Sequence, residues 1–238
     1  MKLFINLVLL LIIVLCIRRG FKKGLIGSVI TLIVMIVSLV FANMLAGTYS
    51  KEIVPALNPF IGGYIDSETT TDKVLENLGY ADSDFSLEDI LEKDSSLRYD
   101  YAYECMRQTG FYKDISEELA GDAVKYSEDT ASSMTDSVIV IVSNTIAYVM
   151  CVTVAFIMIL ILITAILDMF NLDIRLPGLD VVDEISGAAM GLVIGFLYCV
   201  LICWLLGFMG LIIGKETADR DALLRFFLAF RFITRTLI

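Results

Sequence analysis

Four stretches of the chain are apolar and carry no charged residue. They lie at residues 3–17, 25–50, 137–167 and 185–214, with lengths of 15, 26, 31 and 30 residues. An α-helix rises about 1.5 Å per residue, so roughly 20 apolar residues cross the hydrocarbon core of a bilayer. The last three stretches exceed that length. The flanking Lys2 and Arg18 extend the first one, because long basic side chains can reach the headgroups. The pattern therefore predicts four transmembrane helices.

The first apolar stretch could also be a cleaved signal peptide. Residues 18–24, which follow it, read Arg-Arg-Gly-Phe-Lys-Lys-Gly and lack the small residues of a cleavage site. We therefore expect a membrane helix. The four positive charges in these seven residues predict a cytoplasmic basic loop between the first two helices. This orientation makes residues 47–136 extracytoplasmic, whereas the five basic residues of the C-terminal tail favour the opposite orientation.

A polar, acidic segment separates the second and third apolar stretches. Residues 47–136 hold 20 acidic and 7 basic residues, a net charge of −13, while the whole chain has −10. Asp114 and Glu117 have the spacing of a helix-capping box, and period-two alternation is weak, so we expect short helices. We expect the last of them to run directly into the third membrane helix. Pro55 and Pro59 indicate an irregular segment near the start.

These patterns predict an all-α fold: a polytopic membrane protein with four transmembrane helices and a small helical, acidic extramembrane domain. The expected parts are residues 1–46 with the first two helices and their basic loop 18–24, the acidic domain 47–136, helices three and four in 137–214 with a connector at 168–184, and an amphipathic C-terminal helix at 215–238. Arg220, Arg231 and Arg235 of that last helix share one side at about 100° per residue. It either lies in the membrane interface or packs back on the bundle.

Composition restricts the chemistry. The chain is 58% hydrophobic and contains no histidine, which excludes histidine-based triads, metal ligands and proton relays. Of the five cysteines, only Cys105 lies in the acidic domain, so no disulfide forms within that domain. The apolar stretches contain neither an aspartyl pair nor a Ser-Lys dyad. We expect no enzymatic activity, no cofactor and no metal site. The acidic balance also argues against nucleic acid as a partner.

Small residues recur every four positions at two places. Gly187, Gly191 and Gly195 lie at the start of the fourth helix, and Gly20 and Gly24, continued by a serine, lie at the start of the second. Glycines at this spacing form a flat groove that another helix backbone can approach closely. We predict that these five glycines are helix-packing positions and that the two sets could face each other.

An acidic residue precedes the second glycine set. Asp183 is expected at the N-terminus of the fourth helix, where the helix dipole favours a carboxylate. The alternative is a direct role in ion or proton handling.

Two short motifs resemble those of a known family. They are Arg19-Gly20-Phe21 followed by Gly24, and Asp183 followed by Gly187, Gly191 and Gly195. With their order in a four-helix plan, they resemble the colicin V production proteins, which are small bacterial inner-membrane proteins. The resemblance covers the membrane part, and the family typically has a short connection in place of residues 47–136. It implies a non-enzymatic accessory protein of the bacterial cytoplasmic membrane that supports peptide-toxin production or export and envelope homeostasis.

A second functional hypothesis is an oligomeric channel or small transporter. The second, third and fourth apolar stretches contain no charged residue, so a pore would have to form between several copies. Under either hypothesis the expected partners are the lipid bilayer and either further copies of the chain or other membrane proteins.

Overall fold

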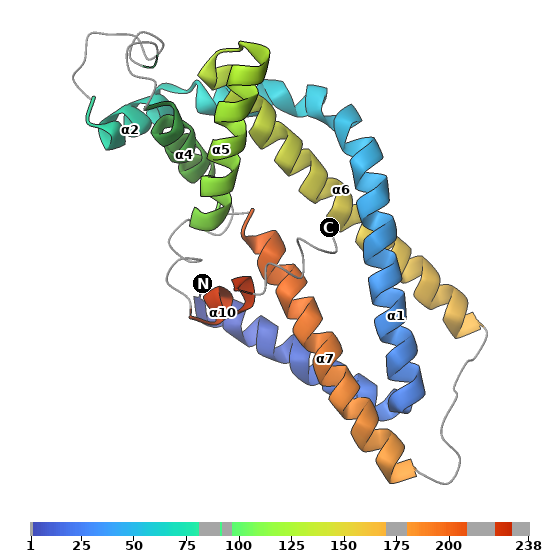
Figure 1. Cartoon of the computed structure of the whole chain (residues 1–238). Helices are drawn as coiled ribbons and strands as arrows, with labels where there is room; N and C mark the ends of the chain where they lie inside the picture. Colours follow the sequence, from blue (N-terminus) through green and yellow to red (C-terminus); the bar gives the residue numbers. More distant parts are fainter. Residues whose placement is uncertain (1, 81–90, 92–96, 170–179, 209–221, 230–238) are drawn as a thin grey trace. The chain divides into compact units, whose positions relative to one another are not determined.

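The computed structural model describes residues 2–80, 91, 97–169, 180–208 and 222–229, and all regular structure in these residues is helical (Figure 1). The helices are α1 (Lys2–Ile65), α2 (Glu68–Leu78), α4 (Leu97–Thr109), α5 (Lys113–Thr130), α6 (Met134–Met169), α7 (Asp180–Leu206) and α10 (Ala222–Leu228). Three of them, α1, α6 and α7, are long and apolar enough to cross a membrane. The described chain is therefore all-α with three candidate membrane spans, as expected for a multi-pass membrane protein.

Helix α1 is 64 residues long and contains a single non-helical residue, Gly24, with φ 72° and ψ −175°. Glycine adopts this left-handed φ without the steric cost of a Cβ atom. The basic segment 18–24 is therefore not the predicted loop, since residues 18–23 are helical and α1 bends at one position (Figure 1). Arg and Lys are good helix formers, so the charges do not interrupt the helix. Pro55 and Pro59 also lie inside α1, where an irregular segment was predicted.

The long helices present large apolar side chains on their surfaces. The exposed fraction is 80% for Leu3, 71% for Phe4, 67% for Met158 and 62% for Ile161. Soluble monomers rarely expose contiguous apolar patches of this kind. The apolar surfaces of these helices indicate contact with a lipid bilayer.

The chain divides into two compact units. One comprises residues 1–46, 151–206 and 220–238, and the other comprises 47–150 and 207–219. The first change of unit falls after Ala46, where the sequence analysis placed the start of the acidic domain. The next falls inside α6, later than the predicted domain end at residue 136.

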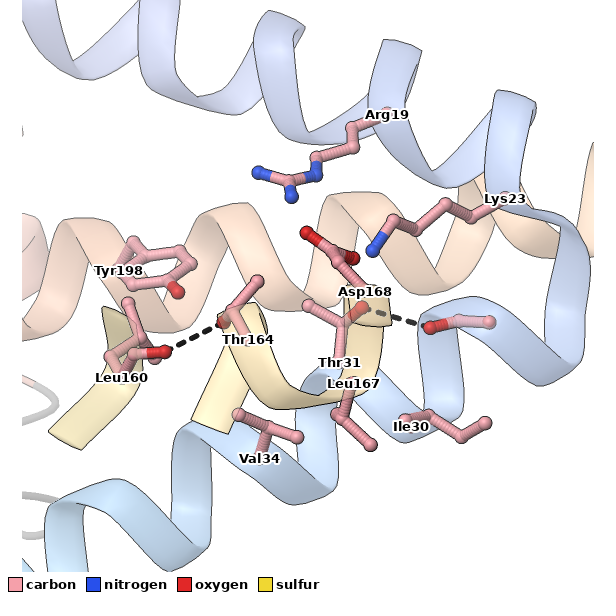
Figure 2. A pocket seen from close by; sticks show the side chains of 11 residues that line it. Arg19, Lys23, Ile30, Thr31, Val34, Leu160, Thr164, Leu167, Asp168 and Tyr198 are labelled. Carbon is pink, nitrogen blue, oxygen red and sulfur yellow. Dashed lines mark hydrogen bonds between the residues drawn. The ribbon is translucent and has the colours of Figure 1, made fainter. Parts of the chain in front are cut away.

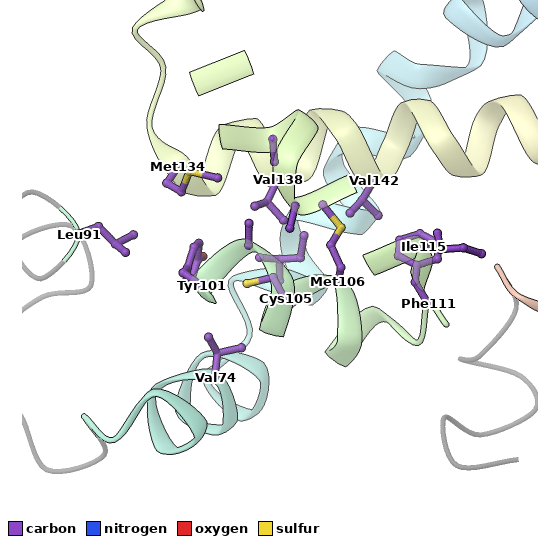
Figure 3. Close-up of a cluster of buried hydrophobic side chains, with 14 residues drawn as sticks. Val74, Leu91, Tyr101, Cys105, Met106, Phe111, Ile115, Met134, Val138 and Val142 are labelled. Carbon is purple, nitrogen blue, oxygen red and sulfur yellow. The ribbon is translucent and has the colours of Figure 1, made fainter. Parts of the chain in front are cut away.

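The second unit has a hydrophobic core built from α2, α4 and α5 together with the C-terminal turns of α1 and the N-terminal turns of α6. Its fully buried side chains include Val74, Met106, Phe111, Ile115, Val138 and Val142 (Figure 3). The last two belong to α6 and are 0% exposed. The hydrophobic core of this unit therefore includes side chains beyond residue 136, because the start of the third apolar stretch is used as protein core.

The details of α5 differ from the predicted capping box. The helix begins at Lys113 with Tyr112 as its N-cap, and no side chain caps it, so Asp114 lies inside the first turn. Its end is also different, because it does not run into α6. Ala131 adopts a left-handed conformation with φ 52° and separates α5 from α6.

Two predicted segments are described only in part. α6 extends to Met169 and α7 begins at Asp180, so both ends of the predicted connector 168–184 are helical, and residues 170–179 lie outside the described residues. Of the predicted helix 215–238, the structure describes only α10 and the residue that follows it. In α10, Leu224 and Phe227 are buried, and the Phe227 ring lies 5.5 Å from that of Phe196 in α7. This short helix packs on the bundle.

Candidate functional site

The N-terminal part of α1 packs directly against α7 through its glycines. A Cβ atom added at Gly20 would lie 2.9 Å from the Cα atom of Gly191, and one added at Gly187 would lie 2.7 Å from the carbonyl carbon of Gly24. Real Cβ atoms essentially never approach backbone this closely. The structure therefore brings the two predicted glycine sets together, and we call this contact the glycine seam.

The glycine seam continues along both helices. A Cβ atom at Gly191 would lie 3.0 Å from the Cα atom of Ile17, and one at Gly195 would lie 3.1 Å from the Cα atom of Ile13. Both glycines thus face backbone of α1. In lipid, where water does not drive helices together, such close van der Waals contact is a main source of association.

The two helices run antiparallel along the glycine seam. Gly24 lies opposite Asp183 at one end. At the other end, the Cys199 thiol donates a hydrogen bond to the backbone oxygen of Leu9 over 3.5 Å. Residue numbers therefore fall along α1 as they rise along α7. Adjacent membrane spans that cross in opposite directions pack in this way.

Asp183 is a buried carboxylate at the bend of α1. Its side chain is 2% exposed, and its Oδ1 atom accepts a hydrogen bond from the backbone N–H of Leu25 at 2.9 Å. Leu25 begins the second part of α1, where backbone N–H groups have no partner inside the helix. A Cβ atom at Gly24 would lie 2.7 Å from Asp183 Cγ, so only glycine leaves room for this carboxylate.

The carboxylate also lies in the first turn of its own helix, α7. Asp183 therefore faces the N-termini of two helical segments, and both carry partial positive charge. The partial positive charge at both N-termini attracts the carboxylate oxygens. The hydrogen bond also links the bend of α1 to the first turn of α7.

Ser28 completes the contact on the α1 side. It is 1% exposed, and its hydroxyl oxygen lies 3.4 Å from the backbone oxygens of both Gly20 and Gly187, so it can donate to either. The other two residues of the first motif lie outside the seam. Phe21 is 44% exposed, and Arg19 points into a neighbouring pocket.

This pocket, here called the basic pocket, has a volume of about 300 Å³. Its polar lining comes from Arg19, Lys23, Thr31, Thr164, Asp168 and Tyr198, and its apolar lining includes Ile30, Val34, Leu160 and Leu167 (Figure 2). This combination of residues was not predicted from the sequence. The available signal was weak: Lys23 is one of four clustered charges, and Asp168 is a lone charge directly after an apolar stretch.

No metal centre is evident in the part of the chain that the structure describes, where no group of three or more His, Cys, Asp or Glu side chains could hold a metal ion. All five cysteines are free thiols. The chemistry that the seam offers is therefore close backbone packing and one hydrogen-bonded carboxylate.

Comparison with protein-family models, with curated proteins and with solved structures gives no match for this chain. The resemblance to the colicin V production proteins rests on the motif residues, and the function inferred from it is a proposal.

Replacing Asp183 by asparagine should lower the free energy of unfolding by about 1 kcal/mol. The amide oxygen can still accept the hydrogen bond from Leu25, but the negative charge facing two helix N-termini is lost. Thermal melting of the purified protein in detergent measures the change. Asp180→Asn, at an exposed position in the same turn, is the matched control and should change stability much less. Equal effects would show that the charge of Asp183 does not act on the bend.

Proposed function

We propose that this protein is a non-enzymatic accessory protein of the bacterial cytoplasmic membrane, of the colicin V production type. In this role it supports the production or export of a peptide toxin and, more broadly, envelope homeostasis. One observation carries the proposal: the glycines and the aspartate of the two motifs lie in one contact, although Leu25 and Asp183, which are hydrogen-bonded there, are 158 positions apart. Motifs that meet in one structural feature are better support than two short matches considered separately.

The proposed topology has four spans. The break at Gly24 divides α1 into residues 2–23 and 25–65, which as helices are about 33 and about 60 Å long. Each is long enough for a hydrocarbon core of about 30 Å. With α6 and α7 this makes four spans, and the antiparallel seam agrees with the first and fourth crossing in opposite directions. Other membrane proteins or further copies of the chain are the proposed partners.

In the proposed orientation, the basic cluster at 18–23 is cytoplasmic and residues 47–136 are extracytoplasmic. Cys105 is the only cysteine in that segment, but it is 1% exposed and burial raises the pKa of its thiol to about 12. Very little thiolate is present at neutral pH, and the buried sulfur is shielded from reagents. The native cysteine is therefore unsuitable as a topology reporter.

A cysteine at the exposed position of Asp122 should report the topology. We expect a membrane-impermeant maleimide to label the introduced cysteine of the Asp122→Cys variant in intact cells, and to leave Cys105 of the wild type unlabelled until the protein is denatured. Mass spectrometry of the labelled chain measures both. Labelling of Asp122→Cys only after lysis would reverse the orientation. Rapid labelling of native Cys105 would contradict the buried core.

The functional test is deletion of the gene in its host followed by complementation. We expect the deletion to reduce secretion of a co-expressed peptide toxin and to lower survival under envelope stress. The wild-type gene should restore both, and so should a Val193→Leu variant, whereas Gly191→Leu should not. Unchanged secretion and survival in the deletion strain would refute the proposed role. Ion or solute flux through purified protein in proteoliposomes would instead favour the channel hypothesis.

A further inference from the structure

The basic pocket collects charges of both signs. Figure 2 shows the Arg19 guanidinium and the Lys23 ammonium pointing into the same space as the Asp168 carboxylate, with the Tyr198 ring on another side. The two cations come from the first part of α1, and the carboxylate comes from the end of α6. Two positive charges and one negative charge around a small volume suit a ligand that carries both signs.

The pocket lies where apolar stretches end. Arg19 follows the stretch 3–17 after one residue, and Lys23 is one residue short of the stretch that begins at position 25. Asp168 directly follows the stretch that ends at Leu167. The charged part of the pocket is therefore expected at the boundary between hydrocarbon and water, which is the level of the phospholipid headgroups.

The two threonine hydroxyl groups in the lining can accept hydrogen bonds from a ligand. Thr31 donates its hydroxyl hydrogen to the backbone oxygen of Gly27 at 2.8 Å, and Thr164 donates to that of Leu160 at 2.7 Å (Figure 2). A hydroxyl carries one hydrogen and two acceptor lone pairs, so both threonines are left as acceptors. The lining thus adds acceptors beside Asp168, and a ligand ammonium group can use them. The apolar residues of the pocket suit the glycerol backbone and the first methylenes of a lipid.

We propose that the basic pocket binds the headgroup of a zwitterionic phospholipid, phosphatidylethanolamine. Arg19 and Lys23 hold its phosphate, and Asp168 with the threonine hydroxyls holds its ammonium. Arginine forms paired, charge-assisted hydrogen bonds with phosphate oxygens, and lysine adds a point charge. An anionic headgroup without a cation, such as phosphatidylglycerol, would leave Asp168 facing a negative charge. The volume of about 300 Å³ is at the lower end of the roughly 300–1,000 Å³ typical of ligand pockets.

The test uses the full-length protein in detergent, titrated with phosphatidylethanolamine and monitored by native mass spectrometry. Arg19→Gln and Lys23→Gln should each weaken binding by about tenfold, since each removes a charge-assisted contact to phosphate. Arg18→Gln is the matched control, because Arg18 is an exposed neighbour that does not line the pocket. Equal lipid binding by all three variants and the wild type would overturn the proposal.

Two further arms identify the ligand. Asp168→Asn should weaken the binding of phosphatidylethanolamine and leave the binding of phosphatidylglycerol unchanged or stronger, so the variant loses selectivity for the zwitterionic lipid. Equal binding of both lipids by the wild type would reject the role of Asp168 in selecting a zwitterion. Soluble phosphoethanolamine and inorganic phosphate are titrated against the bound lipid. If either displaces it at a concentration comparable to that of the lipid, the ligand is a soluble phosphate compound and the lipid assignment is wrong.

Discussion

The Gly191→Leu substitution is expected to destabilise the protein by about 3 kcal/mol, at the upper end of the usual cost of overpacking. Even a bare Cβ atom at this position would lie 3.0 Å from the Cα atom of Ile17 and would press against the backbone oxygen of Cys16. Backbone atoms cannot turn aside as a flexible side chain can, so the leucine must push the first part of α1 away from α7. Contacts at Gly187 and Gly195 would be lost with it.

Thermal melting in detergent measures this effect on the purified protein. Val193→Leu is the matched control. Val193 is 42% exposed on the same helix, so this substitution introduces a leucine away from the seam. Gly191→Ala should fall between the two, since its single methyl group meets the same backbone. If Gly191→Leu melts at the temperature of Val193→Leu, the glycine seam does not hold the helices together.

The sequence was informative about this seam because small residues at four-residue spacing have few uses in an apolar helix. Gly187, Gly191 and Gly195 were recognisable for that reason, and so were the partners Gly20 and Gly24. The register between the two sets was not predictable. It depends on the bend in α1 and on the hydrogen bond from Leu25 to Asp183, which joins residues far apart in the chain.

The bend itself was misplaced as a loop over residues 18–24. Charge clusters are typical of connections between membrane helices, yet Arg and Lys propagate a helix well. Several glycines lie near this position in the sequence. Their local sequence does not indicate which of them adopts a positive φ, and in the structure it is Gly24. Its conformation is selected by tertiary structure, where the Asp183 carboxylate occupies the space of a Cβ atom.

The contribution of α6 to the core of the second unit was also not predictable, for a different reason. Val138 and Val142 belong to a charge-free stretch, and hydrophobicity alone does not distinguish a side chain buried in a protein core from one facing lipid. The basic pocket was missed because its charged residues, Lys23 and Asp168 among them, flank different apolar stretches. Each one separately is an ordinary interfacial charge, and only the folded chain brings them to one place.

The Gly24→Ala substitution is expected to cost about 2–5 kcal/mol, the sum of two effects. The alanine would have to adopt φ 72°, which costs an L-residue roughly 1–2 kcal/mol. Its methyl group would also displace the Asp183 carboxylate and leave the partly buried N–H of Leu25 without its acceptor, which costs about 1–3 kcal/mol.

Gly47→Ala is the control for this substitution within the same helix. A Cβ atom at Gly47 would meet nothing within 4 Å, and the residue is helical, so alanine there should stabilise the protein by about 0.5–1 kcal/mol. Both variants are compared by thermal melting in detergent. The double variant Gly24→Ala with Asp183→Ala separates the two effects, because the clash with the carboxylate is absent when Asp183 is alanine. A double variant as unstable as the sum of the Gly24→Ala and Asp183→Ala single variants would show that Gly24 and Asp183 act independently, contrary to their contact in the structure.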